Sequence, residues 1–163
     1  MKPIRAKPHR LSRDRYRGLV STSFTACLKP RRPFFTTSAT VEPAIEILRN
    51  TLKDNSCSGV YCFMPDHVHV IVTGTSLDSD TFMAFERFKQ QSGWSLKKNT
   101  LGVTWQEGFH DRILRNTHEF GARLRYVLNN PVRAELVENW DDYAFSGGVA
   151  VDLKVLLSEL LPY

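Results

Sequence analysis

Long apolar runs, paired cysteines and internal repeats are all missing from this sequence. No stretch of its 163 residues reaches the ~18 to 20 consecutive apolar residues of a membrane-spanning helix. The basic N-terminal residues are not followed by the apolar segment of a secretory signal. The cysteines, Cys27, Cys57 and Cys62, form no CxxC pair, which argues against both a disulfide framework and a zinc knuckle. We therefore expect buried free thiols in a single cytoplasmic domain over residues 1–163.

Charge is distributed unevenly along the chain. Residues 1–17 hold seven basic side chains against one acid, a net +6, whereas the whole chain carries +5. Residues 135–163 hold six acids against one lysine, a net −5. The basic segment 1–17 favours a polyanionic partner, although a solvated terminus accounts for the same charges. The acidic tail over 148–163 either folds over the basic surface or, through its leucines, forms a helix that completes the core.

Hydrophobic periodicity predicts the order of the elements. Strands are expected at 19–28, 59–64, 67–72 and 103–114, and helices at 41–53, 79–97, 117–130 and 151–161. Thr40 is the expected N-cap of the first helix, and Pro131 is expected to end the third. This order predicts an α+β fold of the ferredoxin-like split βαβ type, an antiparallel sheet with two helices on one face and two further helices appended. The other face of the sheet is then free to bind a ligand.

The stretch PDHVHVIV at 65–72 suggests a metal site. Side chains alternate across a strand, so His67 and His69 point the same way while the intervening valines point into the core. Two imidazoles on neighbouring positions of one face suit a single divalent cation, but such a site needs further ligands. Taken alone, the pattern fits a strand that merely carries two histidines equally well.

A second group of polar residues lies on the helix expected at 117–130. Tyr126 and Asn130 are four residues apart and so share one helix face. An amide oxygen is an acceptable ligand for Mg²⁺ or Mn²⁺, with Asn129 as the competing amide. A phenol, whose pKa is near 10, becomes a nucleophile only if its proton is removed or its oxyanion is stabilised. A half-buried helical aromatic is the alternative interpretation of Tyr126.

Three motifs in this order carry a family resemblance. The segments MPDHVHVIV, WQEGFHDRILR and YVLNNPVRAELV, with the leader YRGLVSTSFTACLKPRRPFF, resemble the REP-associated tyrosine transposases. These are bacterial relatives of the insertion-sequence single-tyrosine transposases in the HUH nuclease superfamily. The resemblance covers roughly residues 15–147.

The resemblance implies a set of roles. His67, His69 and Asn130 would bind Mg²⁺ or Mn²⁺, and Tyr126 would attack a DNA phosphate to give a 5′-phosphotyrosine and a free 3′-OH. The substrate would be single-stranded DNA beside a REP-type hairpin, in the bacterial cytoplasm at the nucleoid. Candidate DNA contacts are Arg10, Arg13, Arg15, Arg17, Arg112 and Arg115. Candidate base-stacking residues are Tyr16, Phe24, Phe34 and Phe35, for each of which packing in the core is the alternative.

Two other functions remain as alternatives to a single-tyrosine DNA endonuclease and transposase. One is a nucleic-acid-binding module on a ferredoxin-like sheet without chemistry, and the other is a metal-dependent hydrolase of small phosphoesters. The second leaves the basic segment and Tyr126 unexplained. We expect a monomer, with a dimer that exchanges the tyrosine helix as the alternative, and no membrane partner.

Overall fold

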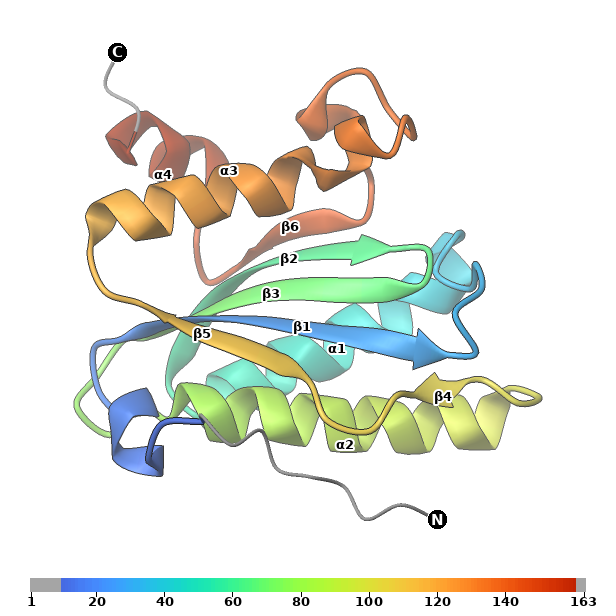
Figure 1. The fold of residues 1–163 in the computed structure, drawn as a ribbon, viewed down its shortest axis with the longest axis horizontal. Coiled ribbons are helices and arrows are strands. Elements are labelled where there is room, and N and C mark those ends of the chain that lie inside the picture. The colour runs from blue at the N-terminus through green and yellow to red at the C-terminus, as the bar shows by residue number, and fades with distance from the viewer. Residues whose placement is uncertain (1–9, 161–163) are drawn as a thin grey trace.

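The computed structural model describes residues 10–160, which form an antiparallel sheet between two pairs of helices (Figure 1). The strands are β1 (Ser21–Lys29), β2 (Cys57–Met64), β3 (His67–Gly74), β4 (Thr104–Trp105), β5 (His110–Leu114) and β6 (Ser146–Val149). The helices are α1 (Ser38–Asp54), α2 (Thr81–Asn99), α3 (Thr117–Arg133) and α4 (Leu153–Leu160), with short 3-10 turns η1 (Arg13–Tyr16) and η2 (Trp140–Asp142).

The sheet has the strand order β4-β1-β3-β2-β6, and β5 pairs with the same strand, β1, as β4 does. All pairings are antiparallel. The order confirms the predicted ferredoxin-like arrangement, with β6 added beside β2. The predicted strand at 103–114 is in fact two strands, because the chain bends at Gly108, whose φ is +73°.

Strand β6 was not expected, because SGGV lacks the β-branched residues that mark a strand. Its pairing with β2 depends on close approach of the backbone to a ring. A Cβ at Gly147 would lie 2.6 Å from the hydroxyl of Tyr61, so any larger residue there would have to displace the Tyr61 ring. A strand that depends on such a long-range contact leaves almost no recognisable pattern in its own sequence.

The sheet separates two hydrophobic cores. Helices α1 and α2 cover one face, where Val68, Val70 and Val72 of β3 are buried with the phenylalanines of α2. Helices α3 and α4 cover part of the other face, where Ile71 packs with Leu124 and Leu128 of α3. The expectation that this second face is free is therefore wrong, because the apolar side of α3 packs against the sheet and is buried there.

The leucines of α4 resolve the two alternatives for the acidic segment. Leu153, Leu156, Leu157 and Leu160 pack against the core between α3 and the sheet, and residues 146–149 belong to β6. Most of this segment up to residue 160 is thus part of the fold rather than a tail. Two terminal segments, residues 1–9 and 161–163, lie outside the described residues. The first of them includes the predicted basic residues Lys2, Arg5 and Lys7.

Two helix boundaries differ from the prediction. Helix α1 begins at Ser38 with Thr37 as N-cap, and Thr40 is the third helical residue of a capping box rather than the cap itself. Helix α3 continues through Pro131 to Arg133, since Ala134 N–H donates to the carbonyl of Asn130 and extends the helical bonding past the proline. A left-handed residue, Glu135 with φ +59°, follows it.

Three of the four candidate base-stacking aromatics are core residues. Tyr16, Phe24 and Phe35 are each 1% exposed or less, so they cannot stack on a nucleic acid. Phe34 is partly buried against the same core. Cys57 and Cys62 are buried free thiols as expected, whereas Cys27 is only half-buried. No helix within residues 10–160 has the length and apolar character needed to cross a membrane.

We predict that Leu157→Ala lowers the free energy of unfolding by about 1–2 kcal/mol. Full burial makes a leucine truncation cost ~2–5 kcal/mol, and Leu157 is only half-buried. Val155→Ala on the same helix is the control, because Val155 is 54% exposed and should cost less than ~0.5 kcal/mol. Urea unfolding followed by circular dichroism measures both, and equal effects of the two variants would contradict the docking of α4.

Candidate active site

The two histidines lie at the start of β3 and converge on one point. The turn at Pro65 and Asp66 joins β2 to β3, so His67 is the first residue of the strand and His69 follows on the same face. Their Nε2 atoms are 3.2 Å apart and their ring planes are perpendicular. Two ligand nitrogens ~2.0–2.1 Å from one cation have a separation of this size, so the pair fits a shared metal.

A hydrogen bond to the outer nitrogen holds each imidazole in place. Asp66 Oδ1 is 2.7 Å from Nδ1 of His67, and Thr25 Oγ1 of β1 is 2.9 Å from Nδ1 of His69. Arg31 in turn donates from Nε to the other oxygen of Asp66, at 2.9 Å. Such partners orient metal-binding histidines and leave Nε2 as the atom that is presented to a ligand.

The electrostatic surroundings keep His69 neutral. Burial lowers the pKa of His69 to about 3, assisted by the electrostatic effects of the neighbouring His67 and Arg123 side chains. For Asp66, burial raises the pKa, but the hydrogen bonds from Arg31 and His67 outweigh burial and the net pKa is lowered. A neutral imidazole beside an anchored carboxylate is the protonation state that binds a cation.

Tyr126 projects from α3 over this pair. Its ring lies edge-on to His69, with 5.9 Å between ring centroids, and it remains 40% exposed. The guanidinium of Arg123 lies 4.7 Å from the centre of the Tyr126 ring, and that of Arg133 lies 5.3 Å from it. The structure thus brings together a phenol, two imidazoles and two cations that come from β3 and α3.

Asn130 lies one helical turn after Tyr126, but no described hydrogen bond joins it to the histidines. Its amide nitrogen donates to the carbonyl of Tyr126, at 3.0 Å, which leaves the amide oxygen as the donor atom for a cation. Asn129 instead lines a hollow with Trp140 of η2 and Leu157 of α4. Within residues 10–160 no cluster of three or more His, Cys, Asp or Glu side chains could hold a metal, so a third protein ligand would have to be of another type.

Comparison with known proteins agrees with these motifs. No family model matches the chain. A REP-associated tyrosine transposase of Escherichia coli K12 is 28% identical over 83 residues, which cover 51% of this chain and 48% of that protein. A putative REP-associated tyrosine transposase of Haemophilus influenzae is 23% identical over 106 residues, covering 56% and 60% respectively. A solved structure of a REP-associated tyrosine transposase bound to a REP hairpin superposes with a TM-score of 0.71 at 22% identity, over 86% of this chain and 82% of the other.

The predicted resemblance is confirmed. The chain is similar to the REP-associated tyrosine transposases in sequence and shares the fold of the hairpin-bound structure. It spans about half of the length of the first of these curated relatives and three fifths of the second.

The six arginines predicted to contact DNA do not form one group. Arg10 and Arg13 hold the segment around η1 to the core, through ion pairs with Asp111 and Glu86 and contacts with the Phe82 ring. Arg15, Arg17 and Arg115 instead line a hollow of about 800 Å³ between η1 and the start of α3. Arg17 lies 3.7 Å from Asp80, and Arg112 is exposed, 3.9 Å from Glu119.

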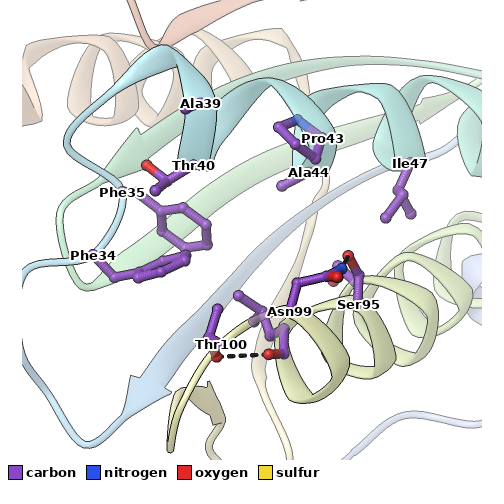
Figure 2. A pocket seen from close by; sticks show the side chains of 12 residues that line it. Phe34, Phe35, Ala39, Thr40, Pro43, Ala44, Ile47, Ser95, Asn99 and Thr100 are labelled. Carbon is purple, nitrogen blue, oxygen red and sulfur yellow. Dashed lines mark hydrogen bonds between the residues drawn. The ribbon is translucent and has the colours of Figure 1, made fainter.

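Another hollow, of about 290 Å³, lies between α1 and α2 (Figure 2). Phe34, Phe35 and Ile47 line it together with Asn99 and Thr100. Ile47 of α1, Asn99 of α2 and the flanking residues lie on the face of the sheet opposite α3. The hollow is therefore separate from the site around Tyr126.

Sequence reasoning missed the residues that support the site. Arg123 could have been found, because it precedes Tyr126 by three residues and therefore shares its helix face. Thr25 and Arg31 could not, because their contacts with His69 and Asp66 depend on the pairing of β1 with β3 and on the loop after β1.

The lowered pKa of His69 predicts a pH dependence of stability. Above pH 6.5 both states carry a neutral His69, whereas below it the unfolded chain binds a proton that the folded protein excludes until about pH 3. Stability is therefore lost as the pH falls, by roughly 3 kcal/mol at pH 4 for this group in the metal-free protein.

Urea unfolding of wild type and His69→Gln from pH 8 to pH 4 measures this effect. The two proteins should have parallel curves above pH 7, where His69 is neutral in both states, and wild type should lose more stability below pH 6.5. Parallel curves over the whole range would contradict a buried neutral His69.

Proposed function

We propose that this protein is a metal-dependent, single-tyrosine DNA endonuclease and strand transferase that acts on single-stranded DNA beside a REP-type hairpin. The observation that carries the proposal is the meeting of Tyr126 with His69, from segments about 60 residues apart, above two imidazole nitrogens that face one point. The names of the relatives and the hairpin bound in the similar structure support the same class of substrate.

The metal site is proposed to consist of His67, His69 and Asn130, with Mg²⁺ or Mn²⁺ as the cation. The 3.2 Å separation of the Nε2 atoms and the oriented imidazoles fit such an ion. Asn130 is preferred over Asn129, because the Asn129 side chain faces the hollow beside Trp140 and Leu157. When bound, the cation polarises a phosphate and orients it for displacement.

Tyr126 is the proposed nucleophile. Its phenol loses a proton to solvent, and a bond forms between its oxygen and the phosphorus while the bond from phosphorus to the 3′ oxygen breaks. The 3′ oxygen takes up a proton and leaves as a free hydroxyl, and the DNA stays attached as a 5′-phosphotyrosine. The exchange of one phosphate ester for another conserves the bond energy, so reversal of the step can join strands without a nucleotide cofactor.

The hollow lined by Arg15, Arg17 and Arg115 is the proposed contact for hairpin phosphates. It lies at the start of α3, whereas Tyr126 lies nine residues further along the same helix, ~14 Å away. A DNA strand that passes from the hollow towards Tyr126 would neutralise these cations in a salt-sensitive manner. A monomer suffices for the proposed chemistry, because both histidines and Tyr126 meet within one chain.

We predict that Tyr126→Phe abolishes covalent attachment to DNA but retains hairpin binding within about threefold. The substitution removes only the attacking oxygen and leaves the ring against His69. Labelled single-stranded hairpin DNA with Mn²⁺, run on a denaturing gel, detects the adduct, and fluorescence anisotropy measures affinity. Binding by wild type without any adduct would favour the non-catalytic module, and an adduct with Tyr126→Phe would exclude Tyr126 as the nucleophile.

The two asparagines allow a matched test of the metal site. Asn130→Ala should weaken Mn²⁺ binding by about tenfold, as does loss of a supporting metal contact, while Asn129→Ala should leave it unchanged. His69→Ala should abolish binding because it removes one of the two imidazoles. Titration followed by electron paramagnetic resonance measures free Mn²⁺ directly, and equal effects of the two asparagine variants would remove Asn130 from the ligand set.

A further inference from the structure

Arg123 lies one turn before Tyr126, and a second element holds its side chain in place. Its Nε donates to Ser23 Oγ of β1 at 2.7 Å, and its guanidinium covers the Tyr126 ring at 4.7 Å. The Nε bond to Ser23 occupies one edge of the guanidinium and leaves the two terminal nitrogens, which can donate to two oxygens of one anion.

Strand β1 positions both halves of the site. Ser23 and Thr25 are two residues apart and so lie on the same face, one bonded to Arg123 and the other to His69. The register of β1 with β3, in which Thr25 pairs with His69 and Ser23 with Ile71, sets where the arginine lies relative to the imidazoles. The guanidinium is therefore placed by the same strand as the proposed metal ligand.

The charge of Arg123 has no counter-ion in the described part of the chain. No carboxylate of residues 10–160 lies within ion-pair distance of it, although its side chain is half-buried. Burial lowers the pKa of Arg123, Tyr126 opposes this shift, and Arg112 lowers the pKa further. The basic neighbours are thus Arg112 and Arg133, which contacts the same tyrosine ring. A partly buried cation without a partner costs stability, which favours a site built to receive an anion.

We propose that Arg123 is a catalytic residue that binds non-bridging oxygens of the phosphate attacked by Tyr126, and that Ser23 is a positioning residue that aims it. This inference rests on the proposed function. During the displacement, negative charge on the phosphate oxygens redistributes as the phenol oxygen bonds to phosphorus. A fixed guanidinium beside the phenol stabilises that charge without reorganisation.

The chemistry explains why arginine is used here instead of lysine. A guanidinium has a planar fork that matches two phosphate oxygens while its third nitrogen stays bonded to Ser23. A lysine would supply the charge but could not make both contacts at once. Arg125 provides a matched control on the same helix, because it is exposed and lines the hollow beside Trp140 and Leu157.

The rate of adduct formation in single turnover, at saturating hairpin DNA with Mn²⁺, tests the inference. We expect Arg123→Gln to lower this rate by about 10²–10³-fold, as for loss of a donor to a developing oxyanion. Arg123→Lys should lower the rate by about tenfold, since the charge is retained but the planar guanidinium is lost. Ser23→Ala should also lower it by about tenfold, since the guanidinium is retained but its hydrogen bond to β1 is lost. Arg125→Gln should leave the rate unchanged.

Two further measurements separate catalysis from binding and from folding. In a Tyr126→Phe background, Arg123→Gln should change hairpin affinity by less than about threefold, because the contact is strongest during the reaction. Its midpoint of thermal unfolding should be equal to or higher than that of wild type, since an unpaired cation has been removed. A structural arginine would instead lower the midpoint when replaced.

The possible failures are distinguishable. If wild type forms no adduct, the proposed function fails and the role of Arg123 fails with it. If wild type forms the adduct and Arg123→Gln forms it as fast as Arg125→Gln, only the role of Arg123 is wrong. Equal losses of rate and affinity would make Arg123 an ordinary DNA contact, and a lower unfolding midpoint with a normal rate per folded molecule would make it a structural residue.

Discussion

The antiparallel pairing of β1 with β3 is the constraint on which the site depends. Thr25 lies opposite His69 in this register and bonds its outer nitrogen, while Ser23, two residues earlier, bonds Arg123 of α3. A slip by one residue would turn both hydroxyls to the opposite face and bring Phe24 or Ala26 beneath α3. That slip is opposed by the burial of Phe24, which stacks on Phe85 of α2 with ring centroids 4.4 Å apart. The packing of aromatic residues on one face of the sheet therefore fixes the register that positions Ser23 and Thr25 on the other face.

The alternation of side chains between the two faces explains how one strand can contribute to both the hydrophobic core and the candidate site. On β3, the valines between and after the histidines pack against α1 and α2, and the histidines face α3. Helix α3 covers Ile71, in the middle of β3, with its leucines and presents Tyr126 to His69, two residues earlier in the strand. A single helix thus contributes apolar burial and the proposed nucleophile from neighbouring positions. The leucines of α4 extend the same apolar core between α3 and the sheet.

The parts that could be predicted from sequence are those with a local period. A spacing of two placed His67 and His69 on one face, and a spacing of four placed Tyr126 and Asn130 on another, without knowledge of the fold. The interpretation of Pro131 as a helix end failed because the proline removes one backbone donor but leaves the carbonyls of Asn130 and Pro131 free to accept from Ala134 and Leu136. Strand β6 was missed because its pairing with β2 involves the close approach of Gly147 to the Tyr61 ring, and this long-range contact leaves no periodic pattern in the sequence. The contacts of Thr25, Ser23 and Arg31 depend on strand register and a loop path, which composition does not encode.

The charges around Tyr126 show where stability and function diverge. Arg123 and Arg133 lie against one exposed phenol, and the acids of this region are already bonded elsewhere, Asp66 to Arg31 and Glu119 to the backbone of Arg115, with Arg112 a further 3.9 Å ion-pair neighbour of Glu119. Folding alone would favour a carboxylate among these arginines, because it would relieve their mutual repulsion. An intramolecular carboxylate there would also compete with a phosphate for the same donors and weaken binding of the reacting group. The cationic surroundings of Tyr126 are therefore best explained by an anionic ligand that supplies the missing charge when it binds, and the stability lost in the free protein is recovered in the complex.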